Sequence, residues 1–300
     1  MQSLGPGFCT SLKLPVIRNT QDSLFLRRPS FCSHSLARTS DCLSLRTQNP
    51  LAFRGSCLNN RLESGSGVAI VASLSSEGED AKHGVKKKLA VFVSGGGSNF
   101  QSIHEACVAG SVHGEVVALV TNKGGCGGAV YARDNDIPVV LFPRTKEEPN
   151  GLFASDLVAA LRRYEVDFIL LAGYLKLIPV ELIQAYPKSI LNIHPSLLPA
   201  FGGKGYFGMK VHKAVIASGA RYSGPTIHFV DEHYDTGRIL AQSVVPVLAS
   251  DTAEELAARV LKEEHRLYVE AVAAICQERI VWREDGIPLI QSIDNPNLYS

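Results

Sequence analysis

Leu89-Ala90-Val91-Phe92-Val93-Ser94-Gly95-Gly96-Gly97-Ser98-Asn99 joins an apolar run directly to three glycines and a polar pair. The apolar run is typical of a strand buried on both faces, and the residues after Asn99 have helical periodicity. Glycines let the backbone approach an anion closely, and the free amides at a helix start favour a phosphate. The stretch therefore predicts a strand–loop–helix unit with a phosphate site; a plain turn capped by Ser98 is the alternative.

Strand-like and helical segments alternate along the chain from residue 88 onward. We expect strands near residues 89–94, 116–121, 139–142, 168–172 and 190–194, and helices near 99–108, 129–135, 152–164 and 209–218. Two more strands, near 225–230 and 238–247, precede a long amphipathic helix near 253–278, which Thr252 or Asp251 would cap. This alternation predicts an α/β fold with a mostly parallel sheet and helices on both faces.

The first 75 residues differ in composition from the rest. They hold eight Lys or Arg, three acidic residues and 13 serines. A Ser-rich, Arg-containing and acid-poor segment is typical of an organelle transit peptide, although an unaddressed disordered tail has a similar composition. We therefore expect a disordered transit peptide at residues 1–75, a charged leader at 76–87 and one folded domain at 88–300.

The remaining chain is mildly acidic. Of the 30 basic and 29 acidic residues, those outside residues 1–75 number 22 and 26 respectively. This balance disfavours a nucleic-acid-binding surface, and no apolar run approaches the roughly 20 residues that cross a bilayer. Outside the first 75 residues the cysteines are widely spaced, so neither a disulfide framework nor a zinc site is indicated. We expect small-molecule substrates and no metal; the sequence does not define the oligomeric state.

A polar pair ends the apolar run at residues 190–194. Side chains alternate across a strand, so Asn192 and His194 share a face, and Pro195 stops the strand just beyond them. In open α/β sheets, ligands bind at the carboxyl ends of the strands. The pair predicts an amide donor and a titratable base in a binding site; a core histidine bonded to a backbone carbonyl is the alternative.

Four further features of the sequence could contribute to such a site. Asp235 precedes Gly237 in a turn, and a carboxylate near His194 would raise the pKa of the imidazole; a simple turn residue is the alternative. His228 can be read as an ordinary strand residue. Residues 171–178 could wall a flat heteroaromatic ligand, or form a plain connection after a strand. Residues 263–265, Glu-Glu-His, suggest by default a solvated helix face.

In combination, these segments closely resemble the phosphoribosylglycinamide formyltransferase family, the folate-dependent enzymes of purine synthesis. The resemblance runs from about residue 88 to 283. It rests on four motifs in order: Ser-Gly-x-Gly-Ser-Asn at 94–99, Leu-Ala-Gly at 171–173, Asn-Ile-His-Pro-Ser at 192–196, and Asp-x-Gly at 235–237. It implies a Rossmann-like formyltransferase fold, 10-formyltetrahydrofolate as formyl donor, and the amine of glycinamide ribonucleotide as acceptor.

The resemblance also implies roles for individual residues. Asn192 would donate a hydrogen bond to the formyl oxygen, His194 would act in proton transfer, and Asp235 would orient His194 and keep its pKa high. The ribonucleotide would be bound by Gly97, Ser98, Asn99 and Glu264. The folate would be bound by Leu175, Lys176, Leu177, Ile178, Asp231, Glu232, His233 and Tyr234. No metal is implied, and no basic residue can be assigned to folate.

Residues 201–208, Phe-Gly-Gly-Lys-Gly-Tyr-Phe-Gly, depart from the pattern expected of bacterial relatives. This loop is longer than expected and could cover the site or alter substrate contacts. The sequence thus predicts a plastid glycinamide ribonucleotide formyltransferase located in the chloroplast stroma, with mitochondrial import left open. Two alternatives remain at this point: formyltetrahydrofolate deformylase, where water replaces the amine, and a non-catalytic folate- or nucleotide-binding protein.

Overall fold

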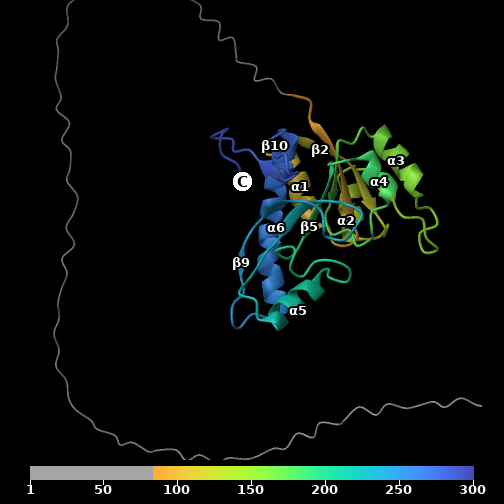
Figure 1. Ribbon diagram of the computed structural model, residues 1–300. Coiled ribbons are helices and arrows are strands. Elements are labelled where there is room, and N and C mark those ends of the chain that lie inside the picture. The colour runs from red at the N-terminus through yellow and green to blue at the C-terminus, as the bar shows by residue number, and fades with distance from the viewer. Residues whose placement is uncertain (1–83) are drawn as a thin grey trace, which may run out of the picture. The chain divides into compact units, whose positions relative to one another are not determined.

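The computed structural model describes residues 84–300, and Figure 1 shows how their elements are arranged. The predicted transit peptide and most of the leader lie outside the described residues. A seven-stranded sheet has the order β3-β2-β1-β4-β5-β7-β8, in which β1 to β5 run parallel and β7 and β8 run antiparallel to their neighbours. The predicted α/β fold with a mostly parallel sheet is confirmed.

The elements have the following bounds. The strands of this sheet are β1 Lys87–Val93, β2 Gly114–Thr121, β3 Val139–Leu141, β4 Phe168–Leu171, β5 Ile190–His194, β7 Thr226–Phe229 and β8 Ile239–Gln242. The helices are α1 Ser98–Val108, α2 Gly127–Asp134, α3 Ala154–Arg163, α4 Val180–Ala185, α5 Met209–Ser218 and α6 Ala253–Cys276. Two small antiparallel pairs join β6 Tyr222–Ser223 to β9 Val245–Pro246 and β10 Ile280–Trp282 to β11 Pro288–Ile290.

Each face of the sheet has its own apolar core. Alternate residues of β1 point to opposite faces, so Leu89, Val91 and Val93 join one core while Ala90 and Phe92 join the other. Helices α1, α2 and α6 cover the first face and α3 and α4 the second (Figure 1). Because both faces are covered, the strands can be apolar throughout, as the quoted stretch is.

Helix α6 is fixed at its start and near its middle. Thr252 forms a capping box with Glu255, which confirms one of the two predicted caps. Tyr268 is fully buried, and its hydroxyl lies 3.2 Å from the carbonyl oxygens of both Leu171 and Leu191. The helix is thereby hydrogen-bonded to the last residue of β4 and to the second residue of β5.

One predicted strand is wrong in extent. Residues 238–247 form β8 and β9, which belong to different sheets. Gly224 lies against the connection between them: a Cβ there would be 1.8 Å from the carbonyl oxygen of Ser243, so only glycine allows the crossing. Helix α4 and strands β6, β10 and β11 were not predicted, because segments of two to six residues are too short to show a periodicity.

The topology of the sheet indicates that a ligand binds at the carboxyl ends of its central strands. Strand β1 connects through α1 to β2 on one side, while β4 lies on its other side, so the strand order reverses between β1 and β4. Ligands bind outside the carboxyl ends of strands at such a reversal. No helix among residues 84–300 is long and apolar enough to cross a membrane.

Candidate active site

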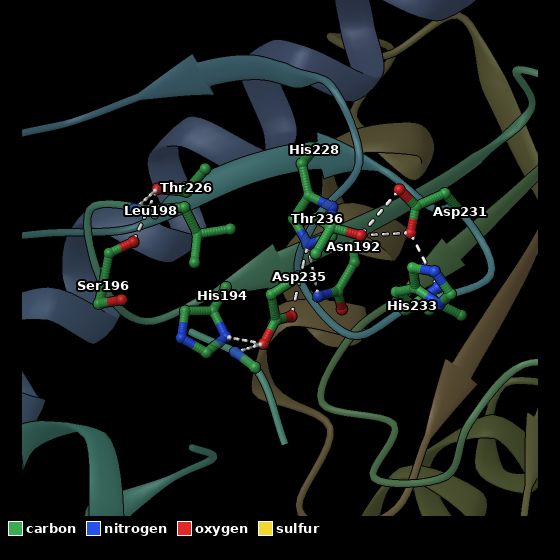
Figure 2. Close-up of polar contacts among 12 residues, drawn as sticks. Asn192, His194, Ser196, Leu198, Thr226, His228, Asp231, His233, Asp235 and Thr236 are labelled. Atoms are coloured by element: carbon green, nitrogen blue, oxygen red, sulfur yellow. Dashed lines mark hydrogen bonds and ion pairs between the residues drawn. The ribbon is translucent and has the colours of Figure 1, made fainter. Parts of the chain in front are cut away.

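Asn192 and His194 lie at the carboxyl end of β5, as the strand alternation predicts (Figure 2). His194 is only 4% exposed. The turn after it is held from β7, where the Thr226 hydroxyl donates to the Ser196 carbonyl (2.7 Å) and accepts from the Leu198 amide (3.0 Å). The imidazole therefore has a fixed position at the end of its strand.

Asp235 lies between two imidazoles in Figure 2. Its Oδ2 is 3.4 Å from His194 Nδ1, and its Oδ1 is 3.6 Å from His228 Nε2. Asp235 has a left-handed backbone with φ 57°, and a Cβ at Gly237 would lie 1.7 Å from the carbonyl oxygen of Phe229. The turn thus requires its glycine and brings the carboxylate to the histidine.

The pKa of His194 differs from the value that the resemblance implies. Burial lowers the pKa of His194 below its ordinary value, and the Asp235 carboxylate raises it by less than burial lowers it. The predicted effect of Asp235 on this pKa is therefore confirmed in direction, but the expected high value is not found, because burial outweighs the carboxylate. Burial also raises the pKa of Asp235, but the neighbouring rings of His228 and His194 and the Gly203 amide outweigh it, so the net shift is downward.

His228 is a site residue that the sequence did not distinguish from an ordinary strand residue. Its Nδ1 donates to the carbonyl of Phe229 (2.9 Å), so its Nε2 accepts from the Asn192 amide nitrogen at 3.0 Å. Strand pairing places Asn192 directly opposite His228 in β5 and β7. This bond fixes which way the Asn192 amide points and leaves its second N–H free for another acceptor.

The loop 201–208 touches the catalytic candidates directly. The carbonyl of Phe201 accepts a hydrogen bond from His194 Nε2 (2.9 Å), and the amide of Gly203 donates to Asp235 Oδ2 (2.8 Å). Both nitrogens of His194 therefore face acceptors, an arrangement that the protonated imidazole satisfies fully. Loop 201–208, which differs from the pattern expected of bacterial relatives, therefore contacts the two catalytic candidates His194 and Asp235.

A cavity of about 610 Å³ opens beside these residues, within the usual range for small-molecule sites. It brings together twelve of the predicted site residues: Asn99, Leu175, Lys176, Leu177, Ile178, Asn192, His194, Asp231, His233, Tyr234, Asp235 and Glu264. Gly97, Ser98 and Glu232 do not line it. Loop 201–208 also contributes to the wall, through residues 203–208.

The glycine loop supports one end of the cavity. Helix α1 is capped by Gly97, which has φ 79°, and Ser98 makes no capping bond, so the alternative of a turn capped by Ser98 is wrong. A Cβ at Gly97 would lie 2.8 Å from the Cα of Gly128, and the Gly128 amide donates to the Gly95 carbonyl (3.0 Å). The amino ends of α1 and α2 therefore meet at this loop.

Asn99 and Glu264 face each other across this end of the cavity. The Asn99 amide nitrogen donates to Glu264 Oε2 at 2.7 Å, and the Asn99 Oδ1 is buried without a partner. Burial raises the pKa of Glu264 above its usual value. The default reading of residues 263–265 as a solvated face is therefore wrong for Glu264, because α6 turns that side chain inward.

The opposite wall is joined to the glycine loop by Ser94, a residue of the 94–99 motif for which the sequence predicted no role. The hydroxyl of Ser94, at the end of β1, donates to Asn122 Oδ1 (2.6 Å) and accepts from the amide of Leu175 (3.0 Å). Leu175 and Leu177 are half-exposed toward the cavity, so this wall offers apolar surface and backbone groups. Within residues 84–300, no three His, Cys, Asp or Glu side chains gather to hold a metal ion.

Comparison with known proteins defines the class to which this fold and site belong. Residues 87–272 match the formyl transferase family, and the chain belongs to that family. It is 78% identical to "Phosphoribosylglycinamide formyltransferase, chloroplastic" of Vigna unguiculata, over 71% of this chain and 68% of that protein, and 73% identical to the Arabidopsis thaliana protein of the same name, over 71% and 74%. The crystal structure of glycinamide ribonucleotide transformylase 1 from Symbiobacterium toebii matches with a TM-score of 0.62 at 34% identity, covering 69% of this chain and 95% of that one. Within that family, the chain belongs to the phosphoribosylglycinamide formyltransferases.

Proposed function

We propose that this chain transfers the formyl group of 10-formyltetrahydrofolate to the amine of glycinamide ribonucleotide, a step of purine synthesis. One observation carries the proposal beyond family membership: a single cavity runs from Asn99 and Glu264 to residues 175–178, with His194 and Asn192 lining it. Two substrates that enter from opposite ends would meet at these two side chains. The deformylase alternative requires only one substrate and leaves the Asn99 end without a role.

Asn192 supplies the donor for the developing negative charge. As the amine attacks the formyl carbon, charge builds on the formyl oxygen, and the N–H of Asn192 that is not bonded to His228 donates to it. One such donor is typically worth about 2.7–4 kcal/mol in the transition state. The His228 bond keeps this N–H aimed before the substrate arrives, so little reorganisation is required.

His194 holds the proton that the reaction moves. Its two nitrogens face the Phe201 carbonyl and the Asp235 carboxylate, both of which accept, so the site favours an imidazolium geometrically although burial opposes it. A proton held this way can be delivered to the formyl oxygen or to the leaving nitrogen of the folate, and the proton that the attacking amine loses then replaces it on His194. Asp235 orients the ring and compensates its charge.

The remaining predicted residues divide between the two substrates. Gly97, Ser98, Asn99 and Glu264 would hold the ribonucleotide, with its phosphate at the converging starts of α1 and α2. The folate would lie against the wall formed by Leu175, Lys176, Leu177 and Ile178 and against the loop formed by Asp231, Glu232, His233 and Tyr234. That wall combines apolar side chains with backbone groups, which suits a flat heteroaromatic ring.

The enzyme acts in the chloroplast, as do its close relatives by name. Residues 1–75 would serve as the transit peptide, with the folded domain from residue 88. A fluorescent reporter fused to residues 1–75 should enter plastids in leaf cells. A reporter that stays in the cytosol contradicts this assignment, and one that also enters mitochondria shows dual import.

The activity is tested by following tetrahydrofolate release from 10-formyltetrahydrofolate with and without glycinamide ribonucleotide. Release that depends on the ribonucleotide supports the transferase, and equal release without it indicates the deformylase. A binding protein would release nothing. His194→Ala separates that last case, because an enzyme loses turnover while it still binds folate.

A further inference from the structure

His212 is a buried histidine that the mechanism above does not use. It lies in the second turn of α5, is 5% exposed and lines the cavity. Its Nδ1 is fully buried and has no hydrogen-bond partner, and within residues 84–300 its ring forms no hydrogen bond at all. His194 and His228, which line the same cavity, have polar partners at both of their ring nitrogens.

A buried polar ring without partners carries a cost that calls for an explanation. An unsatisfied buried group costs roughly 1–3 kcal/mol, and nearly all such groups in native proteins are paired. Burial and the nearby His194 both lower the pKa of His212, so the ring is neutral and has one N–H. An N–H without an acceptor is rarer than an acceptor without a donor, so the enclosed Nδ1 is the bare nitrogen. The proton is then on Nε2, the nitrogen that a molecule in the cavity can reach.

The position of α5 indicates which substrate that molecule is. Val211 and Val215 pack against Val260 of α6 in one apolar cluster. Glu264 follows Val260 by one helical turn on the same side of α6. His212 therefore lines the cavity where α5 packs against α6, the helix that carries Glu264, and it lies within electrostatic reach of His194.

We infer that His212 is a further substrate-binding residue, whose Nε2–H donates a hydrogen bond to an oxygen of the ribonucleotide between its phosphate and its reacting amine. This inference rests on the proposed function. The proposed hydrogen bond gives the unpaired ring of His212 an acceptor when the ribonucleotide is bound. It also predicts that the contact serves the ribonucleotide and not the folate.

The test compares three substitutions in the full chain. His212→Phe removes both nitrogens and keeps a flat ring, His212→Gln carries an amide nitrogen near the position of Nε2, and His212→Asn carries one near Nδ1 only. Binding of glycinamide ribonucleotide is measured by titration calorimetry, and KM is measured for both substrates. We expect His212→Phe and His212→Asn to weaken ribonucleotide binding roughly 3- to 10-fold, the effect of one neutral hydrogen bond. His212→Gln should stay within about twofold of wild type, and the KM for 10-formyltetrahydrofolate should change in none of them by more than about twofold.

Each result decides the question. Ribonucleotide binding at the wild-type level in His212→Phe overturns the inference, as does equal weakening by His212→Gln and His212→Asn, which indicates packing alone. If His212→Phe does not fold, the difference between the Gln and Asn variants decides. Wild-type protein that binds no ribonucleotide overturns both the proposed function and this inference, whereas wild-type binding that no variant changes overturns this inference only.

Discussion

Asp235→Asn isolates the charge at the centre of the site. Asparagine keeps the shape of the side chain and an oxygen for the Gly203 amide, so the turn can persist. What it removes is a negative charge 3.4 Å from His194 Nδ1. At an effective dielectric constant near 20, a unit charge pair at that distance attracts by about 5 kcal/mol, whereas a neutral hydrogen bond contributes only about 0.5–1.5 kcal/mol. In Asp235→Asn, the loss of the negative charge should therefore affect His194 more than the loss of a hydrogen bond does.

The direction of the effect follows from which form of His194 the charge favours. Asp235 raises the pKa of His194 against the larger effect of burial, so its removal lowers that pKa further. If the imidazolium delivers the proton, the rate falls as pH rises through this pKa, and in the variant the fall moves to lower pH. We expect kcat at pH 7.5 to drop by about 10²- to 10⁴-fold, with partial recovery toward pH 5.5.

The assay is the pH dependence of tetrahydrofolate release, together with an NMR titration of the His194 ring. Asp231→Asn is a suitable control, because Asp231 bonds to Thr236 and to the His233 amide and makes no contact with His194. Asp231→Asn should leave unchanged the pH at which the rate falls, even where this variant alters folate binding. An unshifted profile in Asp235→Asn, or a shift to higher pH, would refute this account of the proton.

Three further outcomes are expected for stability. Thr252→Ala removes the capping-box hydroxyl of α6 and should cost about 1 kcal/mol in urea unfolding, while Thr252→Ser should cost little. Gly97→Ala should lower Tm, because its positive φ and a Cβ 2.8 Å from backbone disfavour a side chain, whereas Gly96→Ala has open space and should not. Burial lowers the pKa of His194 and of His212, so the unfolded state binds more protons below about pH 6.5, and the free energy of unfolding should fall as pH decreases through that range.

The sheet and its main helices could be predicted from the sequence because each long element carries its own periodicity. Strand β5 was predicted at residues 190–194 and is found there, and α5 was likewise predicted at its observed bounds. The split between β8 and β9 could not be predicted, because it depends on Gly224 meeting Ser243, two segments that come together only in the folded chain.

The site could be predicted in part for the same reason. Asn192 and His194 are two residues apart on one strand, so their shared face follows from local geometry. Asp235 was assigned by resemblance, since no local rule brings it to His194. His228 was read as a strand residue because its role depends on the register of β5 against β7, which the sequence alone does not define.

Two residues of helix α6 that have different roles, Glu264 and Tyr268, are four positions apart. Glu264 points into the cavity, and the Tyr268 hydroxyl donates to the carbonyl oxygens of Leu171 in β4 and Leu191 in β5. Insertion or deletion of one residue between Thr252 and Glu264 would turn both side chains by about 100° around the helix axis, and each would lose its partner at once. The length of this part of α6 is therefore fixed, whereas the glycine-rich loop 201–208 can change in length without moving any strand. Differences in chain length among relatives should accumulate in that loop and be absent from the first half of α6.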